Sequence, residues 1–206
     1  DSTGTVEGTM QCQMGGYAAR HLRKKYYSFP SEEDFIIDFE KKHSNLAVKS
    51  CEFSGLDDLE KDIKETYSFK MDSRGSFVGS MFLLNPLFDE QLSENPFKIE
   101  DRKYPVDFVY PHSTTLIFTL SLPNNAVVEE LPKPTRLVMP NKSLTCLYNV
   151  AQVGNNIQVM YKFDINKTIL IESEYQTLKQ FYSAMVQKHA ENIIIKLQNE
   201  EDTAKL

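Results

Sequence analysis

The sequence predicts an α+β fold, predominantly antiparallel β, in which sandwich-like sheets have about three helices packed on them. The second half of the chain alternates apolar and polar residues in short segments separated by turns rich in Pro, Asn and Gly, as antiparallel hairpins do. Three other segments repeat apolar residues every three or four positions, which is typical of amphipathic helices. With 206 residues, 41% hydrophobic and 25% charged, the chain can bury a sizeable core.

The first hundred residues are expected to alternate between strands and helices. A strand over 4–13 ends at Gly15-Gly16, and a helix over 17–26 places apolar residues four positions apart. Ser31 is expected to cap a second helix that ends near Lys42, because its side chain can accept the amide hydrogen of the residue three positions on. Strands are then predicted over three segments, 46–53, 65–71 and 77–84.

The second half is expected to be denser in strands. The predicted strands are 106–110, 114–122, 127–131, 135–139, 144–152 and 157–165. Gly154-Asn155-Asn156 predicts a tight hairpin, because Gly and Asn tolerate positive backbone angles. Ser173 with Gln176 predicts a capping box for a third helix, and a closing strand is expected over 193–197. The apolar stripe of that helix is Tyr175, Leu178, Tyr182, Met185 and His189.

A domain boundary is expected near residue 100, where Pro, Asn and acidic residues mark a long loop. We predict an N-terminal α+β segment over 1–100 and a C-terminal β-rich domain over 101–198, closed by a helix and a strand. Residues 199–206 are expected to form an acidic tail. Strands on either side of the boundary could still pair with each other.

Charge and hydropathy exclude two classes of partner. A formal net charge of −6 disfavours a general affinity for nucleic acid, because phosphate binding needs clustered Lys and Arg. The basic run Arg20-His-Leu-Arg-Lys-Lys25 is interpreted as the solvated face of a helix. No apolar run approaches the length that crosses a bilayer, so no membrane-spanning segment is expected.

No catalytic, cofactor-binding or metal-binding residue is predicted. Cys12, Cys51 and Cys146 each fall inside an expected strand and have no CxxC spacing, so buried apolar thiols are expected. The four histidines, at positions 21, 43, 112 and 189, lack metal-binding spacings. Asp57 and Asp58 are expected to be solvated in a polar turn. Gly15-Gly16 and the glycines at 75 and 79 lack the spacing of a phosphate-binding loop, so no cofactor is expected.

Several segments together resemble a known but uncharacterised domain. They are Arg102 to Phe108, the strand Thr114 to Leu122, Glu130-Leu-Pro, Glu174 to Tyr182 and Ile193 to Leu197. In these segments the chain resembles the C-terminal domain that follows a transglutaminase-like core in some bacterial multidomain proteins. The residues before Arg102 resemble the segment that joins that core to the domain. The resemblance implies that the Cys, His and Asp of such a core lie upstream of Asp1, and that the protein is extracytoplasmic, periplasmic or in the cell envelope.

Two functions are compatible with these observations. The first is a non-catalytic accessory or interaction module of a larger transglutaminase-like or cysteine-protease-like protein, with the upstream domain of the same polypeptide as its partner. It predicts an exposed apolar patch where that neighbour docks. The alternative is an independent module that binds carbohydrate or peptide, which predicts a concave cluster of exposed Tyr with hydrogen-bonding side chains. A thiol enzyme is the third and weakest option, because the cysteines lack the helix N-terminus that such enzymes use.

Overall fold

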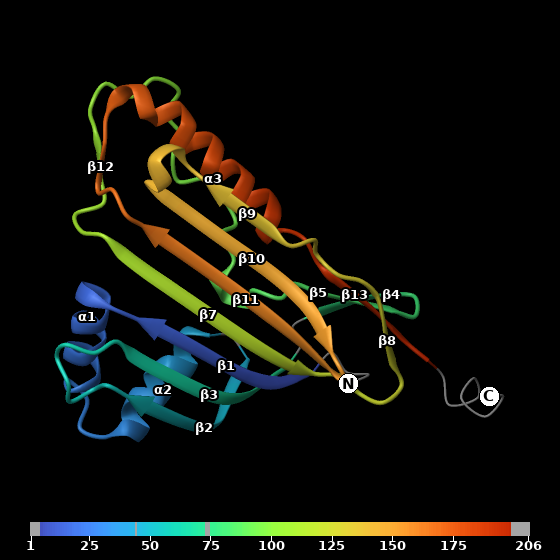
Figure 1. Cartoon of the computed structure of the whole chain (residues 1–206). Coiled ribbons are helices and arrows are strands. Elements are labelled where there is room, and N and C mark those ends of the chain that lie inside the picture. The colour runs from blue at the N-terminus through green and yellow to red at the C-terminus, as the bar shows by residue number, and fades with distance from the viewer. Residues whose placement is uncertain (1–4, 44, 73–74, 199–206) are drawn as a thin grey trace.

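The computed structural model describes residues 5–43, 45–72 and 75–198. A seven-stranded antiparallel sheet forms the framework, in the order β2-β3-β1-β7-β11-β10-β9 (Figure 1). Its strands are β1 (Val6–Met14), β2 (Leu46–Ser54), β3 (Ile63–Met71), β7 (His112–Ser121), β9 (Thr135–Val138), β10 (Leu144–Val153) and β11 (Asn156–Ile165). The predicted acidic tail at 199–206 lies outside the described residues.

A second, four-stranded sheet packs against the first, in the order β4-β5-β13-β8. Its strands are β4 (Gly75–Val78), β5 (Met81–Leu84), β8 (Ala126–Glu130) and β13 (Ile193–Leu197). A two-stranded pair joins β6 (Val106–Asp107) to β12 (Ile169–Leu170). The α-helices are α1 (Gly16–Tyr26), α2 (Glu32–Lys42) and α3 (Tyr175–His189), with short 3-10 turns at Phe88–Glu90, Pro140–Lys142 and Glu172–Glu174. The predicted α+β, sheet-rich and sandwich-like class is therefore confirmed.

One face of the large sheet carries the core. The register aligns Tyr67, Met10, Phe118, Val159 and Val150 across five neighbouring strands, and all five side chains are buried. Antiparallel partners share a face and residues alternate along each strand, so the intervening positions face solvent. Rows of large apolar side chains on a single face require covering layers, and their burial supplies most of the stabilisation of the fold.

Helices cover the two ends of that face. On α2, Phe39 stacks on Tyr67 of β3 with ring centroids 4.6 Å apart. On α3, His189 lies 5.0 Å from Tyr161 of β11, and all five residues of the predicted α3 stripe are buried. Between the helices, Phe88 contacts Phe118 in an edge-to-face arrangement. Ser31 caps α2 as predicted, because its Oγ accepts the amide hydrogen of Asp34.

Three local predictions were wrong. The segment 77–84 is a hairpin of β4 and β5 and not one strand, because Gly79 adopts a φ of +63° and reverses the chain. Of the strand predicted over 106–110, only Val106–Asp107 forms. Ser173 does not cap α3: it lies in a 3-10 turn, where the Glu174 carboxylate accepts the amide hydrogen of Ile171.

Strands from both sides of the expected boundary pair within one sheet. β1 lies between β3 and β7, so a strand of the first hundred residues bonds directly to a strand of the second half. The division at residue 100 stays a prediction. None of the described helices has the length and apolar character to cross a membrane.

Candidate binding surface around α1

Six exposed or half-buried residues from α1 and from the loop before β7 lie together. The helix lies past the end of the large sheet (Figure 1). The six residues line a pocket of about 460 Å³, and we call them the α1 surface. Its members are Tyr17, Arg20, His21 and Lys24 from α1, with Val109 and Tyr110 from the loop before β7. Residues about ninety positions apart in the sequence therefore form one concave surface.

Tyr110 is the central aromatic ring of this surface. Its centroid lies 4.8 Å from that of Tyr17 and 6.2 Å from that of His21. It also lies 5.7 Å from the ring of His112, in an edge-on arrangement. Tyr17 is 52% exposed, so the aromatic pair keeps a large area available to a ligand. Exposed aromatic side chains of this kind offer both an apolar face and a polar hydroxyl.

The neighbouring residue Val109 is held in an unusual conformation. Its φ is +69°, a left-handed value that a β-branched residue adopts at a cost of about 1–3 kcal/mol. Its amide donates to the Asp107 carboxylate at 2.7 Å, and the Phe108 amide donates to the carbonyl of Thr168 at 2.8 Å. These bonds fix the turn, so the Val109 side chain is left 79% exposed at the rim of the pocket.

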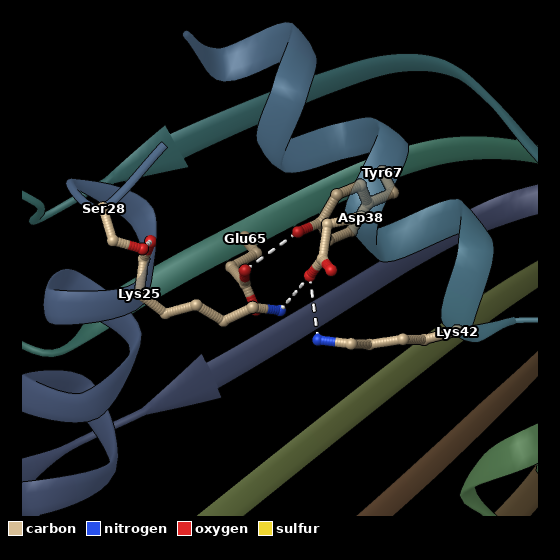
Figure 2. A network of polar contacts seen from close by, with 6 residues as sticks. All are labelled: Lys25, Ser28, Asp38, Lys42, Glu65 and Tyr67. Atoms are coloured by element: carbon tan, nitrogen blue, oxygen red, sulfur yellow. Dashed lines mark hydrogen bonds and ion pairs between the residues drawn. The ribbon is translucent and has the colours of Figure 1, made fainter. Parts of the chain in front are cut away.

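Two cations of the α1 surface have no acidic partner in the described part of the chain. Arg20 and Lys24 are exposed, and within the described ranges no carboxylate lies in ion-pair distance of either. Lys25 on the other side of the helix differs, since its Nζ lies 2.9 Å from Asp38 (Figure 2). Asp38 also pairs with Lys42 at 2.8 Å, and the bonds from Lys42 and Lys25 lower the pKa of Asp38 to about 2.

Arg23 corrects the interpretation of the basic run as a solvated helix face. It is buried, and its guanidinium donates to the carbonyl oxygens of Gly55 at 2.7 Å, Asp58 at 2.5 Å and Lys61 at 2.6 Å. Its Nε donates to the carbonyl of Leu56 at 3.0 Å. Four carbonyl acceptors on one guanidinium hold the whole β2–β3 loop against α1.

The β2–β3 loop, which Arg23 holds in place, adds an apolar residue beside the α1 surface. Leu59, at the loop tip, is 82% exposed. It lines a second pocket of about 350 Å³, to which Tyr17 and Arg20 also contribute. A large aliphatic side chain exposed to water in the same pocket as Tyr17 enlarges the exposed apolar area, and such areas often mark interaction sites.

A polar groove of about 520 Å³ is lined by Pro111 and His112, the residues that follow Tyr110. It runs over the solvent-facing side of the sheet and includes Gln13, Asp62, His112, Ser113, Lys162 and Asn166. Internal bonds organise it: Gln13 donates to Asp62 at 2.8 Å, and Ser113 donates to Asp164 at 2.5 Å. The concave surface thus has an aromatic and basic part and a polar part.

The cysteines lie outside this surface, and each is in a strand as expected. Cys12 and Cys146 are buried, whereas Cys51 is only half-buried. Burial raises the pKa of Cys12, and it raises the pKa of Cys146 to about 12 and that of Cys51 to about 11. A nucleophilic thiol needs the opposite shift, so the described environments favour unreactive thiols.

A buried carboxyl group lies opposite Cys12 in the sheet. Glu65 of β3 pairs in register with Cys12, and its carboxylate accepts the Tyr67 hydroxyl at 2.8 Å (Figure 2). Burial raises the pKa of Glu65, while the bond from Tyr67 acts in the opposite direction. We interpret this pair as a satisfied polar contact beneath α1 and α2.

The histidines and acidic residues considered in the sequence analysis do not lie together in the structure. The rings of His21 and His112 both lie near that of Tyr110. By contrast, His43 lies 3.3 Å from Asp89, and His189 is buried at the end of α3. In the part of the chain that the structure describes, no cluster of three His, Cys, Asp or Glu side chains could hold a metal ion. Asp57 accepts the Tyr27 hydroxyl, and Asp58 accepts the amide of Glu60.

Sequence reasoning missed Tyr17, Val109, Tyr110 and Leu59 as members of a site. One signal was present for Tyr17, since it falls outside the stripe of residues that α1 buries. Tyr110 was assigned to a strand, which hid its position in a loop. Proximity between α1 and that loop depends on the pairing of β1 with β7.

Comparisons with known proteins gave one match. A family model described as a domain of unknown function with solved structure, DUF3858, matches residues 80–195. The comparisons with curated proteins and with solved structures gave no match.

Proposed function

The chain belongs to the DUF3858 family of domains of unknown function, and on that premise we propose that it is a non-catalytic module that binds another polypeptide through the α1 surface. The observation that carries the proposal is the concave group of Tyr17, Tyr110 and Val109, together with two cations that have no acidic partner among the described residues. Aromatic and arginine side chains dominate the energetics of protein interfaces, particularly when they line pockets.

The electrostatics of the candidate nucleophiles support a non-catalytic role. All three thiols have raised pKa values, so little thiolate is present near neutral pH. His21 and His112 lie near a tyrosine ring and not a thiol. Nucleophilic catalysis needs a nucleophile and a base within hydrogen-bond reach of each other.

The parent protein is proposed to be a larger bacterial transglutaminase-like or cysteine-protease-like protein of the cell envelope, whose upstream domain supplies the peptide segment that binds to the α1 surface. Support comes from the sequence resemblance described above and from the exposed apolar residues that an accessory module requires. Reading the coding sequence upstream of the codon for Asp1 tests this. We expect a signal peptide and a core with Cys, His and Asp, and a different upstream domain would refute the transglutaminase-like assignment.

The α1 surface itself is tested by two tyrosine variants. Tyr110→Ala removes the central ring, and Tyr104→Ala is the matched control, because Tyr104 is 79% exposed and lies outside the pocket. In calorimetric titrations against peptide and glycan panels, we expect Tyr110→Ala to weaken binding at least about tenfold, as a lost aromatic anchor does. Tyr104→Ala is expected to bind as the unmodified protein does. Equal affinities for all three proteins would place the binding site elsewhere.

A carbohydrate ligand is the second candidate, and the polar groove beside Tyr110 favours it. Sugars stack on aromatic faces while their hydroxyls bond to groups such as Gln13, Asn166 and Lys162. The same titrations separate the two ligands. Heat with neutral glycans and none with peptides would make the domain a carbohydrate-binding module.

A further inference from the structure

We infer that the α1 surface selects an acidic peptide segment that carries a large apolar side chain next to its carboxylates. The inference rests on the proposed function and specifies its ligand. Cations without acidic partners among the described residues lie next to exposed aliphatic side chains on this surface. The cations favour an acidic ligand over a neutral peptide, and the aliphatic side chains favour a peptide over a glycan.

The cations of α1 fall into two groups, those with partners inside the protein and those that face the pocket. The cations that pack against the protein are satisfied internally: Lys25 pairs with Asp38, and Arg23 donates to four loop carbonyls. Arg20 and Lys24 point to the pocket without a carboxylate partner among the described residues. On a chain with a net charge of −6, this local positive patch complements an acidic ligand and would repel a basic one.

An apolar surface lies beside those cations. Leu59 is 82% exposed and Val109 is 79% exposed. They line two neighbouring pockets, and Tyr17 and Arg20 contribute to both of these pockets. Aliphatic side chains offer a sugar neither a stacking face nor a hydrogen bond. They do offer a leucine-like or aromatic side chain of a peptide a partner, and its burial contributes about 25 cal/mol per Å².

The site is preorganised by hydrogen bonds. Arg23 donates to carbonyls of the loop that carries Leu59, and the bond from the Val109 amide to Asp107 holds the turn that carries Val109 and Tyr110. Tyrosine side chains also lose little conformational freedom on binding, so less entropy is lost when a ligand docks on fixed residues. The site therefore suits a short, extended segment with a few anchoring side chains.

The test uses the full chain and fluorescein-labelled peptides of roughly ten residues, which match the span of a short recognition segment. The probe alternates Glu with Leu and ends in Gly-Ser. One control peptide replaces each Glu by Lys, and another replaces each Leu by Ser. Fluorescence anisotropy measures binding at low and high salt. We expect the acidic apolar peptide to bind at least about tenfold more tightly than either control, with an affinity that salt reduces.

The protein variant that tests the charge is Arg20→Glu with Lys24→Glu. Both side chains are exposed, and we expect the double variant to lose at least about tenfold in affinity for the acidic peptide. Its matched control is Lys133→Glu with Arg136→Glu, which makes the same charge change. Arg136 lies on β9 and Lys133 just before it, and β9 is at the other edge of the large sheet from β2. Circular dichroism and thermal melts verify that both variants are folded.

The outcomes separate this inference from the proposed function. If acidic and basic peptides bind equally, and Tyr110→Ala weakens both, the charge inference fails while the binding function stands. If no peptide binds but polygalacturonate does, in a manner that the double variant abolishes, the acidic partner is a glycan and the peptide inference is overturned. If none of these probes or panel ligands binds, both the inference and the proposed function are overturned.

Discussion

His189 shows how burial changes the chemistry of one residue. It is 1% exposed, its Nδ1 accepts the amide hydrogen of Leu92 at 3.0 Å, and its carbonyl accepts a bond from Asn85. Its Nε2 has no hydrogen-bond partner among the residues that the structure describes. An accepting Nδ1 requires the neutral ring, and burial lowers the pKa of His189 to about 4. The residue thereby fastens the loop after β5 to the end of α3.

This shift predicts a loss of stability in acid. The unfolded state, with a histidine pKa near 6.5, binds the proton more readily than the folded state, so the contribution is complete above pH 6.5 and is lost as the pH falls towards 4. We expect a loss of about 3 kcal/mol from this residue over that range. Urea unfolding of the protein, of His189→Gln and of the exposed control His21→Gln measures it. Only His189→Gln should flatten the pH dependence, and an unchanged slope would contradict the assignment.

At the scale of elements, one arginine joins α1 to the β2–β3 loop. The four carbonyls that Arg23 satisfies come from Gly55, Leu56, Asp58 and Lys61, and Gly55 itself has a φ of +80°. Backbone groups in such a loop have no regular strand partners. A single side chain with five donors replaces those missing partners, which explains why a charged residue is buried there.

Replacing Arg23 by Met should release that loop. We expect a destabilisation of about 2–4 kcal/mol, because the four loop carbonyls lose charged hydrogen bonds. Hydrogen exchange of the loop amides should accelerate at least about tenfold. Arg20→Met, an exposed neighbour on the same helix, is the matched control and should change stability by less than about 0.5 kcal/mol. Equal effects of the two substitutions would show that the hydrogen bonds of Arg23 to the loop contribute nothing to stability.

At the scale of the whole molecule, the large sheet connects the two halves of the chain. β1 bonds to β3 on one side and to β7 on the other, and Phe88 contacts both Phe69 and Phe118. Shared strands and a shared core favour a single cooperative unit.

We therefore expect one unfolding transition. Phe69→Ala in the first half and Leu178→Ala in the second each empty a buried site and should cost about 3 kcal/mol. Both variants should shift the same transition, with far-UV and near-UV circular dichroism in agreement. Two separate transitions, each moved by one variant, would instead support a domain boundary near residue 100.

Much of the fold was predictable from local patterns. The strand at 157–165, the hairpin at Gly154-Asn155 and the Ser31 cap were predicted correctly, because a period of two, a positive-φ turn and an N-cap are properties of neighbouring residues. The hairpin at Gly79 was missed because the apolar run across it resembled one strand. The capping prediction at Ser173 was wrong because Glu174 supplies the competing acceptor.

The sequence by itself determined the fold class, most strands and helices and the strand placement of all three cysteines, since each depends on hydrophobic periodicity and turn chemistry over a few residues. Only the tertiary structure decided that Arg23 is buried, that His189 is a neutral acceptor and that Tyr17 meets Tyr110. These properties arise where segments distant in the chain come together. Their physical cause is the pairing of β1 with β7 and the closure of loops onto helices, which no local pattern of residues encodes.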